Sequence, residues 1–211
     1  MTTVQTLPPM LIADHPALDF LNSVGAPFGE EIEWLATGEC LLDWLAASGL
    51  MAQDQADKCR KNFARTDLDT VARQAIALRE WFRTFLIRQS EFNEWSLDDD
   101  DFNRINGFLG KAVHVFRLHP ASPGDDERKN RPELSGSFAF DSPEDLLALL
   151  ALNIAEFVSV ARLNDTRNCA GETCTMWFVD LTKNKKRRWC DMKICGNRAK
   201  AAAFRERQVK T

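Results

Sequence analysis

Four cysteines near the end of the chain form two pairs with the same internal spacing. Four residues separate Cys169 from Cys174, four separate Cys190 from Cys195, and fifteen lie between the pairs. This spacing matches a zinc ribbon, in which each pair brackets a turn that brings two thiolates to one point. Four thiolates favour Zn²⁺, or iron where the cell supplies it. No histidine lies nearby in the sequence, so we expect a closed structural site that contributes directly to folding.

Other uses of these cysteines have less support. Disulfides need an oxidising compartment, whereas residues 1–10 lack the basic and apolar segments of a secretory signal. A redox dithiol would have a two-residue spacing near a βαβ pattern, and neither is present. The sequence has no run of about 18 apolar residues, so we expect a cytoplasmic protein without a membrane span. Cys40 and Cys59 lie in helical sequence without partners, as ordinary packing residues do.

Charge is divided unequally along the chain. The formal net charge is -4, from 27 Lys and Arg against 31 Asp and Glu. Residues 167–211 contain twelve basic and four acidic side chains, a net of +8, which leaves -12 on residues 1–166. With 45% hydrophobic and 27% charged residues, the composition is that of a globular protein. A basic segment attached to an acidic body favours a polyanionic partner.

Apolar periodicity predicts a mainly helical body. The predicted helices are 39–50, 66–89, 96–110 and 142–163, with a short helix or turn over 13–23. The segment 142–163 is apolar on nearly every side, so we expect it at the centre of the core. Asp14 is expected to cap the short helix, Thr66 and Asp69 to form a capping box, and Ser142 to be an N-cap followed by Pro143.

Strand-like alternation is confined to short segments. Residues 112–118 and 137–140 alternate as strands do, but their pairing would require an unusually long hairpin loop. The predicted fold class is therefore mainly α with a small antiparallel β element. We expect an acidic helical domain over 1–165 and a basic, zinc-ribbon-like module over 166–211 that ends in a helix.

Inside the module, residues 177–179 and 188–189 are expected to run out and back as a hairpin. Trp177, Phe178 and Trp189 are its main large apolar groups, so core packing is favoured over base stacking. The alanine-rich segment after Cys195 has high helix propensity.

Basic side chains occupy both segments next to the cysteines. Residues 183–188 hold five cations in six positions, and more cations follow residue 195. They would partly offset the charge of four thiolates, but that need accounts for only a few of them. Two cationic elements at one zinc site suit phosphates, and Asn197 could read a base edge or brace the metal loop. The predicted nucleic-acid contacts are Lys185, Lys186, Arg187, Arg188, Asn197, Arg198, Lys200 and Arg205.

Two strings in the module resemble a known family. Residues 187–190 read RRWC, and residues 195–198 read CGNR, followed by Lys200. With all four cysteines present, the segment resembles a CGNR-type zinc finger, a bacterial family named for the second string. Residues 15–23, HPALDFLNS, are similar to the start of the ABATE domain that usually precedes this finger, although Ser23 stands where the family often has Thr. The resemblance covers nearly the whole chain and implies a stress-induced transcription regulator whose finger binds nucleic acid.

Several functions stay open on this basis. DNA binding is favoured, with the acidic domain sensing a small-molecule effector or forming a homodimer. RNA binding is hardly separated from it, because zinc ribbons serve both nucleic acids, and a zinc-stapled module for an acidic protein partner is a third possibility.

An enzyme has the least support. The sequence shows no nucleophile–base signature and no phosphate-cradling glycine loop, so we expect no enzymatic activity. His15, Asp19 and Asn22 would share one helical face, at i, i+4 and i+7, and could form a polar or ligand site. Polar residues at a helix start more often cap and brace the first turn, which is the interpretation we favour.

Overall fold

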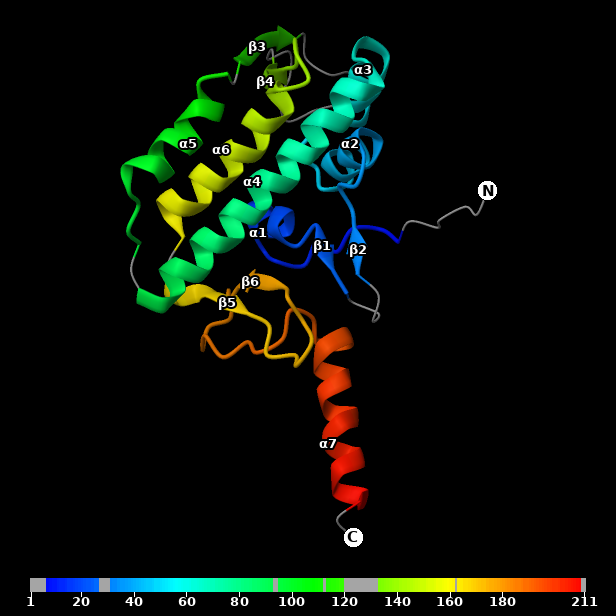
Figure 1. Ribbon diagram of the computed structural model, residues 1–211, viewed down its shortest axis with the longest axis vertical. Coiled ribbons are helices and arrows are strands. Elements are labelled where there is room, and N and C mark those ends of the chain that lie inside the picture. Colours follow the sequence, from blue (N-terminus) through cyan, green and yellow to red (C-terminus); the bar gives the residue numbers. More distant parts are fainter. Residues whose placement is uncertain are drawn as a thin grey trace.

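The structure, a computed structural model, describes residues 7–26, 31–92, 95–111, 113–119, 133–161 and 163–209 (Figure 1). Its elements, in chain order, are α1 (Pro16–Leu21), β1 (Val24–Gly25), β2 (Ile32–Glu33), α2 (Gly38–Ala47), α3 (Gln53–Asn62), α4 (Arg65–Phe92), α5 (Asp99–Leu109), β3 (Val113–His119), β4 (Glu133–Ala139), α6 (Asp145–Val160), the 3-10 helix η2 (Leu163–Asp165), β5 (Thr166–Asn168), β6 (Trp177–Val179), the π-helix η3 (Met192–Gly196) and α7 (Asn197–Val209). The predicted fold class is confirmed: the chain is mainly helical, with small antiparallel sheets and a helix after the cysteines.

The core lies between the long helix α4 and the apolar helix α6. α4 packs against α6 and α2, and α5 covers α6 from the other side (Figure 1). The predicted apolar stripe of α4 is buried along its whole length: Leu68, Val71, Ala75, Leu78, Phe82 and Phe85. α6 buries residues on most of its circumference, as predicted for a central helix.

The start of α4 differs from the prediction because α2 packs closely against it. α4 begins at Arg65, so Thr66 lies in its first turn and forms no capping box with Asp69. The Asp69 carboxylate instead accepts a hydrogen bond of 2.8 Å from the Gly38 backbone N–H, at the first residue of α2. A Cβ on Gly38 would lie 2.4 Å from the Leu68 Cβ, so only glycine permits this approach.

The predicted cap of α1 is also wrong. His15, not Asp14, is the N-cap, and its side-chain Nδ1 accepts a hydrogen bond of 3.2 Å from the Ala17 backbone N–H. Asp14 has a positive φ of 59° and turns the chain into the helix.

α6 begins two residues later than predicted, with Glu144 at the N-cap position. Ser142 is not its cap; the Asp145 carboxylate in the first turn accepts hydrogen bonds from the backbone N–H groups of Asp141 (2.9 Å) and Ser142 (2.8 Å). The Asp145 side chain, which belongs to the first turn of the helix, therefore organises Asp141 and Ser142 in the segment that precedes α6. The helix ends at Val160 rather than near residue 163.

Helix α3 has no clear sequence signature. Its buried side chains are Ala56 and Cys59, so its apolar periodicity is too weak to predict its bounds. Cys59 is a core residue and Cys40 is half-buried.

The conditional pairing of the two strand-like segments is confirmed. β3 and β4 are antiparallel, with Val113 opposite Ala139 and His119 opposite Glu133. β4 begins four residues before the predicted residue 137. Residues 120–132 of the predicted long loop lie outside the described residues.

The cysteine-containing segment packs below the helical body. β5 and β6 lie beneath α1 and the end of α4, and α7 projects from them away from the rest of the protein (Figure 1). Across the described ranges, no helix combines the length and apolar character that a membrane crossing requires.

Candidate metal centre and nucleic-acid interface

The four predicted cysteines meet at one point. The Sγ atoms of Cys169, Cys174, Cys190 and Cys195 all lie within 4.8 Å of one another. The Cys174–Cys190 and Cys190–Cys195 sulfur separations are 3.7 and 3.6 Å. A tetrahedral zinc ion with Zn–S bonds of about 2.3 Å places its sulfurs about 3.8 Å apart, so these residues fit zinc. Three of the cysteines are buried and Cys174 is half-buried, which suits a closed structural site.

The protonation of these thiols also suits a divalent cation. A hydrogen bond with Cys190 lowers the pKa of Cys174 to about 5, and the same contact raises the pKa of Cys190 strongly. Burial raises the pKa of Cys195 to about 12. The Cys174 thiolate therefore opposes ionisation of Cys190 and Cys195, and a cation among these sulfurs would relieve that opposition.

The first metal loop is shaped by backbone hydrogen bonds and a glycine. The Cys169 N–H donates to the Met176 carbonyl (2.9 Å), and the Cys174 N–H donates to the Gly171 carbonyl (3.0 Å). A Cβ on Gly171 would lie 3.0 Å from the Cys174 Cβ and 3.4 Å from the Cys195 Sγ, so a side chain there would press on the site. These contacts turn both thiols of the pair towards one point.

The second metal loop is organised by Asp191. Its side chain accepts hydrogen bonds from the Lys193 and Ile194 backbone N–H groups and so caps η3. The Cys195 N–H donates to the Asp191 carbonyl (3.0 Å). The Cys190 N–H donates to the Cys169 Sγ (3.3 Å), a contact that links the second metal loop to the first.

The strand pairing inside the module differs from the prediction. β6 pairs with β5, with Phe178 opposite Arg167, rather than with residues 188–189. Thr166–Asn168 is too short to show a strand pattern, so its sequence does not reveal this partner. Trp177 and Phe178 are buried, as predicted for core residues, whereas Trp189 is half-buried and stands 5.0 Å from the Arg188 guanidinium.

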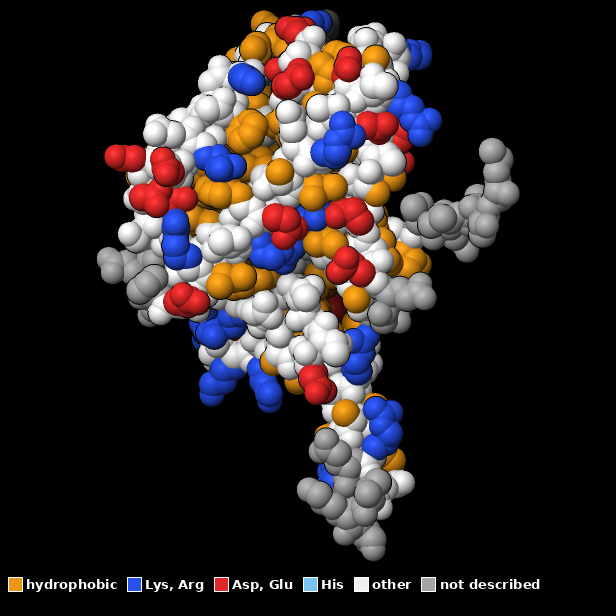
Figure 2. Space-filling view, in the orientation of Figure 1, with side chains coloured by type: hydrophobic (Ala, Val, Ile, Leu, Met, Phe, Trp, Pro, Cys, Tyr) orange, Lys and Arg blue, Asp and Glu red, His pale blue; other side chains and the backbone are white. Residues whose placement is uncertain are grey.

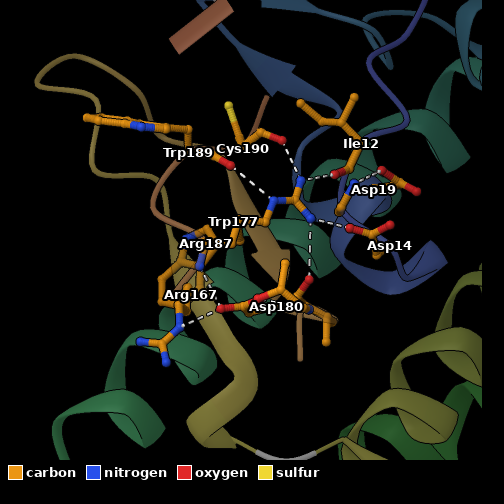
Figure 3. A network of polar contacts seen from close by, with 12 residues as sticks. Ile12, Asp14, Asp19, Arg167, Trp177, Asp180, Arg187, Trp189 and Cys190 are labelled. Atoms are coloured by element: carbon orange, nitrogen blue, oxygen red, sulfur yellow. Dashed lines mark hydrogen bonds and ion pairs between the residues drawn. The ribbon is translucent and has the colours of Figure 1, made fainter. Parts of the chain in front are cut away.

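Arg187 joins the metal loop to the start of the helical domain. Its guanidinium donates to the carbonyl oxygens of Trp189 (3.0 Å), Ile12 (3.0 Å) and Cys190, and forms an ion pair with Asp14 (Figure 3). Only 22% of its side chain is exposed. We therefore assign Arg187 to this joint and remove it from the predicted nucleic-acid surface, because its three guanidinium nitrogens are engaged inside the protein.

Asp180 is a site residue that the motifs do not single out. It is fully buried, and its carboxylate accepts hydrogen bonds from the backbone N–H groups of Thr182 (3.0 Å) and Arg187 (2.9 Å). The Arg167 Nε lies 3.6 Å from it (Figure 3). The sequence offers one clue to this role, because Asp180 is a single acid just before a run of cations and a buried carboxylate needs such partners.

Lys185 is likewise used within the loop. Its Nζ donates to the Asp180 carbonyl (2.6 Å) and forms an ion pair of 3.0 Å with Asp165. It has a positive φ of 49°, which closes the turn. We therefore give Lys185 a structural role as well.

The residues of the proposed polar site have separate partners. The Asn22 amide donates to the Trp177 carbonyl (2.8 Å) and accepts from the Trp177 N–H (2.9 Å), so it extends β6 as a strand would. Asp19 accepts from the Ala13 N–H (3.0 Å), and burial raises its pKa to about 6. His15 caps α1, and burial lowers its pKa. These contacts support the bracing interpretation over a shared ligand site.

The remaining predicted contacts lie at the surface. Exposed side chains occur on the loop before η3 and along α7: Lys186, Arg188, Asn197, Arg198, Lys200 and Arg205. Lys and Arg side chains gather at this end of the molecule, around the loop and along α7 (Figure 2). Beside them is a hollow of about 810 Å³ whose lining includes Lys183, Lys186 and Arg188. The geometry thus presents cations on two elements that flank the metal site.

Comparisons with known families agree with this architecture. Residues 14–160 match ABATE, described as "Putative stress-induced transcription regulator", and residues 166–208 match the CGNR zinc finger. The search of curated proteins found no match to the chain.

Proposed function

Because the chain belongs to the ABATE family and carries a CGNR zinc finger, we propose that it is a transcription regulator that binds nucleic acid, with DNA favoured over RNA. The observation that carries the proposal is the set of exposed cations on the two elements beside the zinc site. Four thiolates around one Zn²⁺ leave two negative charges, which two cations offset. The surplus is available to phosphates.

Zinc has a structural role in this proposal. Cys169, Cys174, Cys190 and Cys195 would hold it, and the bound ion would supply cross-linking energy rather than chemistry on a substrate. The protein's own residues then present the surface. The loop before η3 ends at Cys190, and α7 begins two residues after Cys195, so the bound metal would hold the cations of the loop and of the helix in fixed positions relative to each other.

The first test is the salt dependence of DNA binding. Five phosphate contacts, from Lys186, Arg188, Arg198, Lys200 and Arg205, predict that log affinity against log salt falls with a slope of roughly -4 to -5. Fluorescence anisotropy of the full zinc-loaded chain on a random-sequence duplex measures this slope. Failure to bind any duplex at low salt would remove the proposal.

Charge variants show whether the contacts lie on this surface. Lys186→Gln or Lys200→Gln should each reduce the magnitude of the slope by about 1. Lys61→Gln on α3 is the matched control, because Lys61 is exposed on the helical domain. An equal effect of all three substitutions would indicate non-specific attraction.

The acidic helical domain, proposed as residues 1–165, would supply regulation. A hollow of about 520 Å³ between α4, β1–β2 and the zinc module supports the expected small-molecule effector, since it touches both parts. Its lining includes Glu33, Arg79, Arg83, Thr175 and Trp177. A homodimer through this domain, a cytoplasmic location that keeps the thiols reduced, and a stress signal are further parts of the proposal.

Competing functions give different outcomes in the same assay. Single-stranded RNA that displaces duplex DNA at equal concentration would favour an RNA-binding protein. Tight capture of an acidic protein together with negligible nucleic-acid affinity would favour a protein-interaction module. We propose no enzymatic activity, and the separate partners of His15, Asp19 and Asn22 are consistent with that view.

A further inference from the structure

α7 stands apart from the body of the protein. It has 13 residues, about 20 Å at 1.5 Å per residue. Its main contact among the described elements is η3, at its first turn, and the rest of the helix extends away from the module (Figure 1). An alanine-rich sequence lets such a helix persist with little tertiary support.

One face of α7 carries a stripe of residues suited to contacts with bases. Asn197, Ala201, Phe204 and Gln208 follow each other at i, i+4, i+7 and i+11, which places them on one side of the helix. All four are exposed, and Phe204 exposes 56% of its surface. We call these four residues the central stripe.

Cations border the central stripe on both sides. At about 100° per residue, Arg198 and Arg205 lie to one side of it, and Lys200 and Arg207 lie to the other. Ala199 and Ala202, on the opposite side of the helix, are half-buried. The central stripe and its two cationic rows are therefore the outward surface of α7, and Lys and Arg side chains are visible along the helix in Figure 2.

We propose that α7 lies in the major groove of B-form DNA, with the central stripe towards the base edges and the two cationic rows on the phosphates of the groove walls. This inference rests on the proposed nucleic-acid function and assigns its partner and mode. The major groove of B-DNA, about 12 Å wide, accepts an α-helix, whereas the major groove of duplex RNA is too narrow and deep for side chains to read. The geometry thus selects DNA over RNA duplexes.

The chemistry of the central stripe selects among base pairs. Amide side chains such as Asn197 and Gln208 pair with the N6 and N7 atoms of adenine, and apolar groups such as Phe204 and Ala201 contact the thymine methyl group. The expected target therefore contains A·T pairs where the helix enters the groove.

A protein partner fits this surface less well. Helices that dock into protein grooves present several large apolar anchors along one face. The central stripe offers a single large one, Phe204, between two rows of cations, so its charge matches the walls of a DNA groove.

The test begins with selection of preferred duplexes from a random pool by the zinc-loaded full chain. Anisotropy then compares a selected duplex with its shuffled version for the wild type, Phe204→Ala and Gln208→Ala. Each substitution should lower the preference for the selected duplex about tenfold, within the range that one base contact provides. Affinity for the shuffled duplex and the salt slope should stay unchanged. The matched controls are Phe102→Ala on α5 and Gln74→Ala on α4, both exposed helical positions, and they should keep the preference.

Two changes in the nucleic acid complete the test. Uracil in place of thymine removes the methyl group, so it should weaken binding by the wild type more than binding by Phe204→Ala, which keeps only the Ala201 contact. Duplex RNA of the selected sequence should compete at least about tenfold more weakly than DNA. Absence of a preferred sequence, a preference that survives both stripe substitutions, or equal competition by RNA would overturn the major-groove assignment while leaving salt-dependent binding intact. No binding to any duplex at low salt would instead reject the proposed function itself.

Discussion

Replacing Arg187 by Met should unfold the joint between the zinc module and the helical domain without removing a DNA contact. Arg187 donates to carbonyl oxygens of Ile12, Trp189 and Cys190, and its guanidinium carbon lies 4.2 Å from the centre of the Phe178 ring. Met keeps much of the aliphatic volume, so the substitution isolates the polar contacts and the charge.

The size of the effect follows from what stays behind. The carbonyl oxygens of Ile12, Trp189 and Cys190 would lose their donor in a part-buried site, and the carboxylate of Asp14 would lose its partner. An unsatisfied buried polar group costs about 1 to 3 kcal/mol, and some of these oxygens would regain water, so we expect a loss of about 3 to 5 kcal/mol. A domain of this size has a total stability of about 5 to 15 kcal/mol, so the loss should be plain.

Urea unfolding at a fixed free zinc concentration measures this loss, since bound zinc adds its own stabilisation. Zinc affinity, from competition with a chelator, should fall about 10- to 100-fold because the substitution frees the Cys190 backbone. The salt slope of DNA binding by the folded fraction should not change.

Arg188→Met is the matched control on the next residue. Its guanidinium is exposed over Trp189, so stability should change by no more than about 1 kcal/mol, while the DNA salt slope should fall in magnitude by about 1. The reasoning would be refuted if Arg187→Met were as stable as Arg188→Met, or if it weakened the salt slope in the same way.

Three further predictions concern the contacts of α1 and the metal. Asn22→Asp places a carboxylate against the Trp177 carbonyl, which in the wild type accepts a hydrogen bond from the Asn22 amide at a position only 1% exposed. The free energy of unfolding in urea should fall by about 3 kcal/mol. The control Asn103→Asp, at an exposed position on α5, should change it by no more than about 0.5 kcal/mol. Burial raises the pKa of Asp19 from 3.8 to about 6, so the stability it contributes is present below pH 3.8 and lost as the pH rises through about 6. As the pH rises from about 4.5 to 7.5, the free energy of unfolding of Asp19→Asn should therefore increase by about 1 to 2 kcal/mol relative to that of the wild type. A difference in unfolding free energy that does not change with pH would contradict the raised pKa. Chelation of zinc, or Cys190→Ser, should abolish duplex binding and lower Tm, whereas Cys40→Ser should keep duplex binding and the wild-type Tm. Duplex binding that survives chelation would rule out a metal-dependent surface.

Features encoded within a short stretch of sequence were predictable. The cysteine spacing predicts the metal cluster because each pair only has to close a turn of a few residues. The apolar stripe of α4 predicts its buried face, since every turn of a helix repeats the same environment. The CGNR and ABATE strings identify the family because they are themselves local patterns.

Features that depend on partners far away in the sequence were not predictable. Arg187 reads as one more cation in a basic run, and its partners Ile12 and Asp14 lie 175 and 173 residues away. Asp69 looks like part of a capping box for its own helix, yet it bonds to Gly38 because α2 lies against α4. Where a side chain has more than one plausible partner, tertiary packing decides which one it contacts, and the spacing of residues along the chain does not reveal that packing.

The joint made by Asn22 and Arg187 bears on how such a protein can be rearranged in evolution or by design. Small zinc modules are often treated as cassettes that can be moved between proteins. Here the Asn22 side chain pairs with the backbone of Trp177 in β6, and the loop that carries Cys190 is held by the hydrogen bond from Arg187 to the Ile12 carbonyl. A transplanted finger would leave both supports behind. A working chimera should therefore carry the first turn of the helical domain along with the finger, and substitutions on either side of this joint should be inherited as pairs.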